Sequence, residues 1–127
     1  MTVYVSQQPT PNRHSWVPNL EPATKYGSLK FIFQGDDHPY MWPQRSLDHA
    51  VKILQNFDPE CDHLMWPNTG DPTAMWCAII ALAHMGFERI SFLYWNKPRE
   101  NRQGYYAPIE FNLKEMHHGI KGRDCAS

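Results

Sequence analysis

The chain has 127 residues, a formal net charge of −1 and 42% hydrophobic residues, which is typical of one folded domain. The pI near 6.6 argues against non-specific nucleic-acid binding, because such binding needs a basic face. No basic segment followed by an apolar run opens the sequence, and the apolar run from Met75 to Ala83 is too short to cross a bilayer. We therefore expect a cytoplasmic protein without membrane association.

The cysteines are Cys61, Cys77 and Cys125, an odd number without a C-x-x-C spacing. This pattern favours reduced thiols over a disulfide framework or a structural zinc site. Cys61 and His63 resemble half of a metal site, but the sequence offers no second half. It also lacks the G-x-x-x-x-G-K-[ST] and G-x-G-x-x-G phosphate-binding patterns, so we expect no metal and no cofactor.

Residues 1–28 open with a β-like run, Val3 to Val5, and are then interrupted by four prolines that prevent a helix. The segment also carries large apolar side chains, which need a surface to cover. We expect an irregular N-terminal wrap over residues 1–28 that packs on the domain or on a second subunit.

The core domain is expected over residues 29–113. Residues 29–33 are aromatic and β-branched, which predicts a strand. Apolar residues then recur at steps of three and four between Ser46, a candidate N-cap, and Phe57, and this period predicts an amphipathic helix.

A second strand–helix unit follows. Residues 64–66 form a short apolar run, and Asp71 is a good N-cap because its carboxylate can accept hydrogen bonds from the first-turn amides. Pro72 suits the first helical position, and Gly86 suits a left-handed helix stop. Nearly every residue between them is apolar, so this helix is expected inside the protein or between two surfaces.

Residues 89–95 predict a third strand, and residues 105–113 predict an antiparallel strand that returns beside it. Residues 114–127 form a polar tail. Alternating strands and helices imply parallel strands joined by right-handed crossovers. The predicted fold class is therefore α/β: a small, mostly parallel β-α-β-α-β core with a C-terminal antiparallel hairpin strand and the N-terminal wrap.

Ligands bind beyond the carboxyl ends of parallel strands, and three predicted loops should meet there. They hold the candidate ligand-binding residues Asp36, Asp37, His38, Asn68, Thr69, Gly70, Asp71, Asn96 and Lys97. The carboxylate at the helix start would repel a phosphate, which favours a hydroxyl, an amide or a cation at that point. A small nucleotide-like ligand fits this edge. The simpler interpretation is that Asp71 is only a helix cap and that the carboxylates after the first strand are solvated turn formers.

Two features predict a partner surface. Trp16, Tyr40, Met41 and Trp42 are large apolar residues in segments expected to be irregular. If they are exposed together they form a patch that needs a partner, and otherwise the N-terminal wrap covers the sheet. Arg99 and Arg102 lie in a basic loop that could meet an acidic partner or could simply be solvated.

Five short motifs also carry a family resemblance. They are Phe57-Asp58, Asp62-His63-Leu64-Met65-Trp66, Gly70-Asp71-Pro72, Phe92-Leu93-Tyr94-Trp95 and Tyr106-Ala107-Pro108-Ile109. In this order, over residues 57–113, they resemble a pattern in small uncharacterised proteins of tailed bacteriophages. The resemblance implies a phage origin and carries over no catalytic residue.

The sequence holds no complete catalytic constellation, which favours a non-enzymatic phage protein that binds a host protein in host takeover or counter-defence. A homodimer is expected, because a short sheet leaves an open edge and the apolar N-terminal segment needs a cover. One alternative is a small metal-assisted hydrolase or nucleotide-processing enzyme that uses Asp36, Asp37, His38 and Asp71. Another alternative is a virion or scaffold component.

Overall fold

A computed structural model describes residues 1–10, 19–66, 71–97, 104–112 and 115. Within these residues five strands form one sheet in the order β2-β1-β3-β4-β5. The strands are β1 (Thr2–Gln7), β2 (Ser28–Phe33), β3 (His63–Met65), β4 (Arg89–Asn96) and β5 (Tyr105–Asn112). The first four run parallel, and β5 returns antiparallel to β4. The predicted α/β class, with a mostly parallel core and an antiparallel C-terminal strand, is confirmed.

The opening segment differs from the predicted wrap. Thr2–Gln7 is a buried strand in the middle of the sheet, between β2 and β3, and not part of an irregular cover. Its Val3–Val5 run packs on both faces of the sheet, and this tertiary burial outweighs the prolines that follow it. The 3-10 helix η1 (Glu21–Tyr26), later in the same segment, does cover one face of the sheet.

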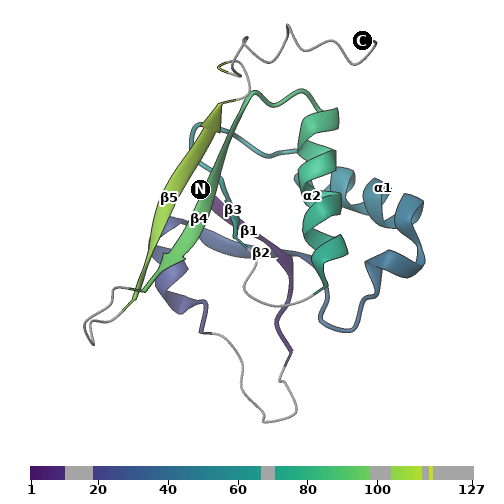
Figure 1. The fold of residues 1–127 in the computed structure, drawn as a ribbon, viewed down its shortest axis with the longest axis horizontal. Helices are drawn as coiled ribbons and strands as arrows, with labels where there is room; N and C mark the ends of the chain where they lie inside the picture. Colours follow the sequence, from purple (N-terminus) through teal and green to yellow (C-terminus); the bar gives the residue numbers. More distant parts are fainter. Residues whose placement is uncertain (11–18, 67–70, 98–103, 113–114, 116–127) are drawn as a thin grey trace, which may run out of the picture.

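Two clusters of buried side chains hold the sheet. The larger lies between the sheet and the helices α1 (Pro43–Leu54) and α2 (Pro72–His84), and it includes Leu64 and Leu82. The smaller lies on the opposite face, under η1. Figure 1 shows α1 and α2 side by side, while the β4–β5 pair extends away from them. Neither helix therefore fully covers the β4–β5 part of the sheet.

The α1 helix begins three residues before the predicted N-cap and ends at Leu54, not at Phe57. Pro43 starts it, since a proline loses nothing at the first helical position. Ser46 is therefore not the N-cap: its hydroxyl lies inside the first turn and donates to the carbonyl oxygen of Pro39 at 3.2 Å. That bond ties α1 to the short 3-10 helix η2 (Pro39–Met41).

The α2 helix has the predicted ends. The carboxylate of Asp71 accepts from the Thr73 amide at 2.9 Å, and Pro72 occupies the first helical position. Gly86 has a φ of 82° and stops the helix in the left-handed conformation that glycine adopts at little cost. The sequence predicted these helix ends correctly because each of the signals acts over only a few residues.

The buried carboxylate of Asp62 fixes β1 to the segment before β3. It accepts from the backbone amides of Thr2 and Asp58, each at 2.8 Å. A buried carboxylate with two amide donors is stable where an unpaired one would be costly. Burial of the Tyr4 side chain, and next the negative charge of Asp62, raise the pKa of Tyr4 above its usual range.

Candidate functional site

Gln7, at the carboxyl end of β1, connects two of the three predicted site loops. Its amide nitrogen donates to the carbonyl oxygens of Gln34 and Asp37, at 3.1 and 2.8 Å. Its amide oxygen accepts from the backbone N–H of Asp71 at 2.8 Å. The loop after β2 and the start of α2 therefore meet at this buried side chain.

Sequence reasoning missed Gln7. The available signal was the Val3–Val5 run: if that run is a central strand, the next polar residues lie at its carboxyl end. In this topology β1 is also where the strand order changes direction, with β2 on one side of it and β3 on the other. Such a switch point is the usual ligand edge of an open α/β sheet.

Some of the carboxylate oxygens at this edge already accept hydrogen bonds from backbone amides. One oxygen of Asp37 accepts from the Gln34 amide at 2.7 Å, and this bond closes the turn after β2. In Asp71 one oxygen caps α2, while Oδ2 is buried and has no hydrogen-bond partner among the described residues. Asp36 and His38 are exposed. Among the described residues, no three His, Cys, Asp or Glu side chains gather closely enough to hold a metal ion.

Two predicted regions join at a pocket beside this edge. The pocket has a volume of about 320 Å³ and lies between the loop after β2 and the start of α1. Its lining includes Asp37 and His38 from the predicted ligand edge and Trp42 from the predicted partner surface, together with Arg45 and His49. The sequence analysis had treated the ligand edge and the partner surface as separate features.

The walls of this pocket are held in place. His49 Nε2 lies 2.7 Å from the carbonyl oxygen of Ile32, so it donates its proton there, and its ring packs on Phe33. The Arg45 guanidinium lies over the Trp42 ring, 5.3 Å from its centroid. Such a cation–π contact restrains two side chains that are otherwise exposed.

Tyr40, Met41 and Trp42 are all exposed, at 60%, 54% and 58%. We call these three residues the η2 patch. The helix η2 that presents them is closed by hydrogen bonds from the Met41 and Trp42 amides to the carbonyls of His38 and Pro39. The predicted patch is therefore formed in the protomer by Tyr40–Trp42.

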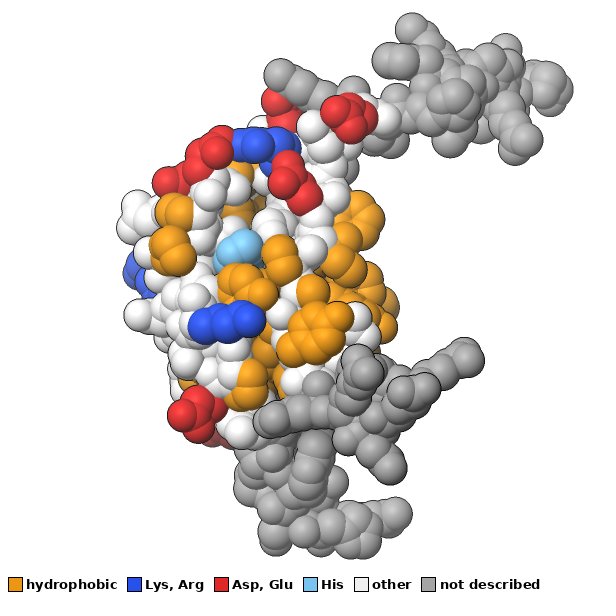
Figure 2. All heavy atoms as spheres, turned by 90° about the vertical axis from the view of Figure 1, so that its left-hand side faces the viewer, with side chains coloured by type: hydrophobic (Ala, Val, Ile, Leu, Met, Phe, Trp, Pro, Cys, Tyr) orange, Lys and Arg blue, Asp and Glu red, His pale blue; other side chains and the backbone are white. Residues whose placement is uncertain are grey.

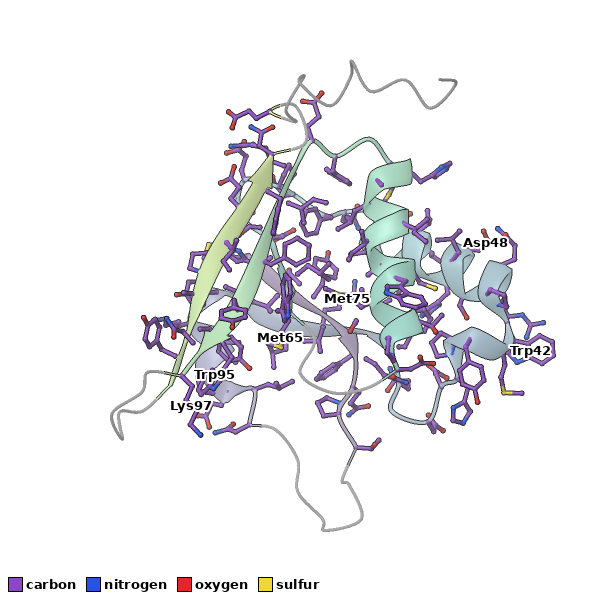
Figure 3. The ribbon with its side chains drawn as sticks, in the orientation of Figure 1. Trp42, Asp48, Met65, Met75, Trp95 and Lys97 are labelled. Carbon is purple, nitrogen blue, oxygen red and sulfur yellow. The ribbon has the colours of Figure 1, made fainter. Side chains whose placement is uncertain are left out.

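The other predicted site residues lie elsewhere. Asn96 is the last residue of β4, and its amide donates to the Tyr105 hydroxyl at 2.9 Å. Figure 3 shows Lys97 at the end of the β4–β5 pair, on the opposite side of the molecule from Trp42. The parallel strands all end at the same edge of the sheet, but the sheet is twisted, so the residues after β4 lie far from those after β2. Asn68, Thr69, Gly70, Trp16, Arg99 and Arg102 lie outside the described residues.

His63 and Ser91 form a close pair away from these sites, with His63 Nδ1 at 2.7 Å from Ser91 Oγ. They lie opposite each other on β3 and β4, and the Tyr26 ring packs edge-on against the imidazole. Burial lowers the pKa of His63 below its usual range, and the Asp62 carboxylate offsets part of this effect. The register alone explains this pair as a cross-strand contact.

An apolar groove of about 550 Å³ lies between α2 and the uncovered face of β4–β5. Its lining is almost entirely hydrophobic and includes Trp66, Met75, Trp76, Ile79, Phe92 and Phe111. We call it the α2 groove. Figure 2, seen from the β5 side, shows several hydrophobic side chains exposed on that side of the molecule. No helix among the described residues is both long and apolar enough to cross a membrane.

The sequence model of one protein family, described as phage Pam3 gp32-like protein, matches residues 1–113. The chain belongs to this family. The match extends well beyond residues 57–113, where the phage resemblance was first seen, and it takes in every strand from β1 to β5. This member of the phage Pam3 gp32-like family is therefore a phage protein. Its described helices and strands all fall within the matched region, and so do Gln7, the η2 patch and the α2 groove.

No curated protein matches the chain in sequence, and no solved structure matches its fold.

Proposed function

We propose that this phage protein is a non-enzymatic binding protein that engages a host protein through the η2 patch, in host takeover or counter-defence. The observation that carries the proposal is the exposure of three consecutive large side chains, Tyr40 and Met41 at the end of η2 and Trp42 directly after it. Three adjacent large side chains in water are unfavourable for a free protein, and such patches mark interaction sites.

The chemistry of the patch suits protein recognition. Trp, Tyr and Arg are the residues that most often dominate binding energy at interfaces, and here Arg45 lies over the ring of Trp42, two residues after Tyr40. Met41 adds an adaptable, polarisable contact. Arg45 also gives the patch a polar neighbour, as protein interfaces usually have around an apolar centre.

The patch is preorganised, which favours binding. Pro39 is buried and fixes one end of η2, while the Ser46 amide donates to the Trp42 carbonyl at 2.8 Å at the other. A partner would therefore not have to order the backbone of this segment, and less of the interaction energy would be lost on association.

The test is capture from a lysate of host cells, followed by measurement with the purified captured protein. Wild type is compared with the double variant Tyr40→Ala/Trp42→Ala and with the control Tyr105→Ala, which removes an exposed aromatic ring on β5. The proposal expects one partner, bound equally by wild type and control and at least ~10-fold more weakly by the double variant. Capture of nothing, or equal binding by all three proteins, would contradict it.

The pocket beside the patch supports a second, smaller proposal: a nucleotide-like ligand bound between Trp42, Arg45 and His38. An aromatic ring can stack on a base, and a guanidinium can pair with a phosphate. Titration with nucleoside monophosphates, followed by amide NMR shifts, should move the signals of these residues in wild type and not in Arg45→Ala. Shifts that are absent, or that persist in the variant, would exclude this pocket.

A further inference from the structure

The α2 helix is apolar on two opposite sides, and only one of them is used within the protomer. Ala74, Ala78 and Ala81 are fully buried against the rest of the protein. The other side carries Trp76 and Ile80, exposed at 61% and 52%, in a stripe that also includes Ile79 and Ala83. This spacing of three and four residues aligns the side chains along one face of the helix.

The stripe continues across the α2 groove onto the sheet. Phe111 and Ile109 of β5 lie opposite Ile90 and Phe92 of β4, so these side chains share the face of the sheet that looks toward α2. Among the exposed members of this combined surface are Trp66, Trp76, Ile79, Ile80, Ile109 and Phe111, each between 37% and 61% exposed. We call these six residues the open face.

The open face is large enough to form the centre of a stable interface. Its six large side chains expose roughly 500 Å² in total, taking ~200 Å² for each when fully exposed. A standard interface buries about 800 Å² on each partner, and the largest apolar patch of an ordinary monomer is ~300–600 Å². The open face therefore supplies more than half of an interface by itself.

The open face carries little charge, which favours a partner surface that is also uncharged. No residue of α2 between Pro72 and His84 is Asp, Glu, Lys or Arg, and the groove lining holds no charged side chain. An acidic or basic partner would find no complementary charge here, whereas two copies of the same surface would meet without repulsion. The apolar side chains that project from α2 lie next to an apolar groove. A surface that pairs with a second copy of itself requires both a projection and a matching groove.

We propose that the open face is an interface between two copies of this chain, related by a two-fold axis. The α2 helices pack against each other, and each copy's Trp76 enters the α2 groove of the other copy. A homodimer was expected from an open sheet edge. Of the two edge strands, β2 and β5, the one beside the α2 groove is β5, and it carries Pro108, a residue that natural edges use against further strand pairing. The face of the sheet is used instead of its edge.

Sedimentation equilibrium of the full chain, from about 1 to about 100 μM, tests this proposal. Wild type should sediment as a dimer of the 14.9 kDa chain. Trp76→Asp and, independently, Ile80→Asp should each weaken dimerisation at least ~100-fold, because a charge on this apolar face has no partner. The matched control Tyr40→Asp, an equally exposed ring on η2, should dimerise as wild type does.

Circular dichroism checks that each variant is folded, and if Trp76→Asp is not, Ile80→Asp decides. A wild type that is monomeric over the whole range would overturn the proposal. So would a dimer that both variants leave intact, or one that Tyr40→Asp weakens equally. The η2 patch and the open face have no residue in common, so failure of the dimer leaves the proposed host binding untouched, and the reverse also holds.

Discussion

The two sides of α2 are equally hydrophobic but have different roles. The covered side holds three alanines, which let the helix approach α1 and the sheet closely, together with Met75, Cys77 and Leu82. The open side carries the larger Trp76 and Ile80, which no described residue covers. Hydrophobicity alone therefore does not show which side stabilises the protomer. The packing does: the side that faces α1 and the sheet is buried, whereas the opposite side leaves Trp76 and Ile80 exposed.

Truncating one residue on each side should give the largest contrast. Leu82→Ala removes a fully buried side chain and should lower the free energy of unfolding by about 3 kcal/mol. Ile80→Ala should change it by less than ~0.5 kcal/mol, because the side chain is half exposed. Urea denaturation followed by circular dichroism measures both, in the Trp76→Asp background so that association does not contribute. Equal losses would mean that the two sides do not differ.

Removing the buried carboxylate of Asp62 should have the next largest effect on stability. Asp62→Ala leaves the amides of Thr2 and Asp58 without their acceptor and should cost about 2 kcal/mol of stability. Asp62→Asn keeps one acceptor oxygen and should lose less. The midpoint of thermal unfolding reports both changes. If Asp62→Ala unfolds at the wild-type temperature, the carboxylate does not hold β1 in place.

Gln7 offers a smaller perturbation at the strand-end edge. Gln7→Ala removes three hydrogen bonds and should cost ~1–2 kcal/mol. Gln7→Glu is the matched control, because it keeps the acceptor for the Asp71 amide but places a carboxylate beside two carbonyl oxygens, so it should not restore stability. Amide hydrogen exchange should quicken at Asp37 in both variants, and at Asp71 in Gln7→Ala, which loses the acceptor of that amide. Unchanged exchange would show that the side chain does not link the two loops.

The smallest expected effect is a pH dependence from His63. Burial lowers its pKa in the folded protein, so below about pH 6.5 the unfolded chain binds a proton that the folded chain resists. The contribution of His63 to stability is therefore complete above that pH and falls as the pH drops. Urea midpoints at about pH 7.5 and pH 5.5 should differ less in His63→Gln than in wild type. An identical difference in both proteins would remove His63 as the cause.

The sequence predicted those parts of the fold that short-range signals specify. Asp71, Pro72 and Gly86 mark the ends of α2 because a cap, a fixed φ and a left-handed stop each act within one turn. The direction of β2, β3 and β4 followed from their alternation with helices. The β-like run Val3–Val5 was recognised but was not placed in the sheet, because its burial depends on β2 and β3, which are distant in sequence.

The same difference between short-range signals and long-range contacts applies to the candidate sites. Tyr40, Met41 and Trp42 were recognisable as a patch because they are consecutive. The role of Gln7 was not, since its partners are residues 34, 37 and 71, which only the folded chain brings together. The open face was also missed, because its members come from α2, the end of β3 and β5, and the apolar helix alone did not show which side its own chain would cover.

The most direct test of the central claim, that the open face joins two copies, is an isotope-filtered NMR experiment on a mixture of labelled and unlabelled chains. The account predicts intermolecular NOEs between the Trp76 ring of one copy and the Phe111 ring or Ile80 methyl groups of the other. Intermolecular NOEs that instead involve Tyr40 and Trp42, or none at concentrations where the chain is dimeric, would contradict it.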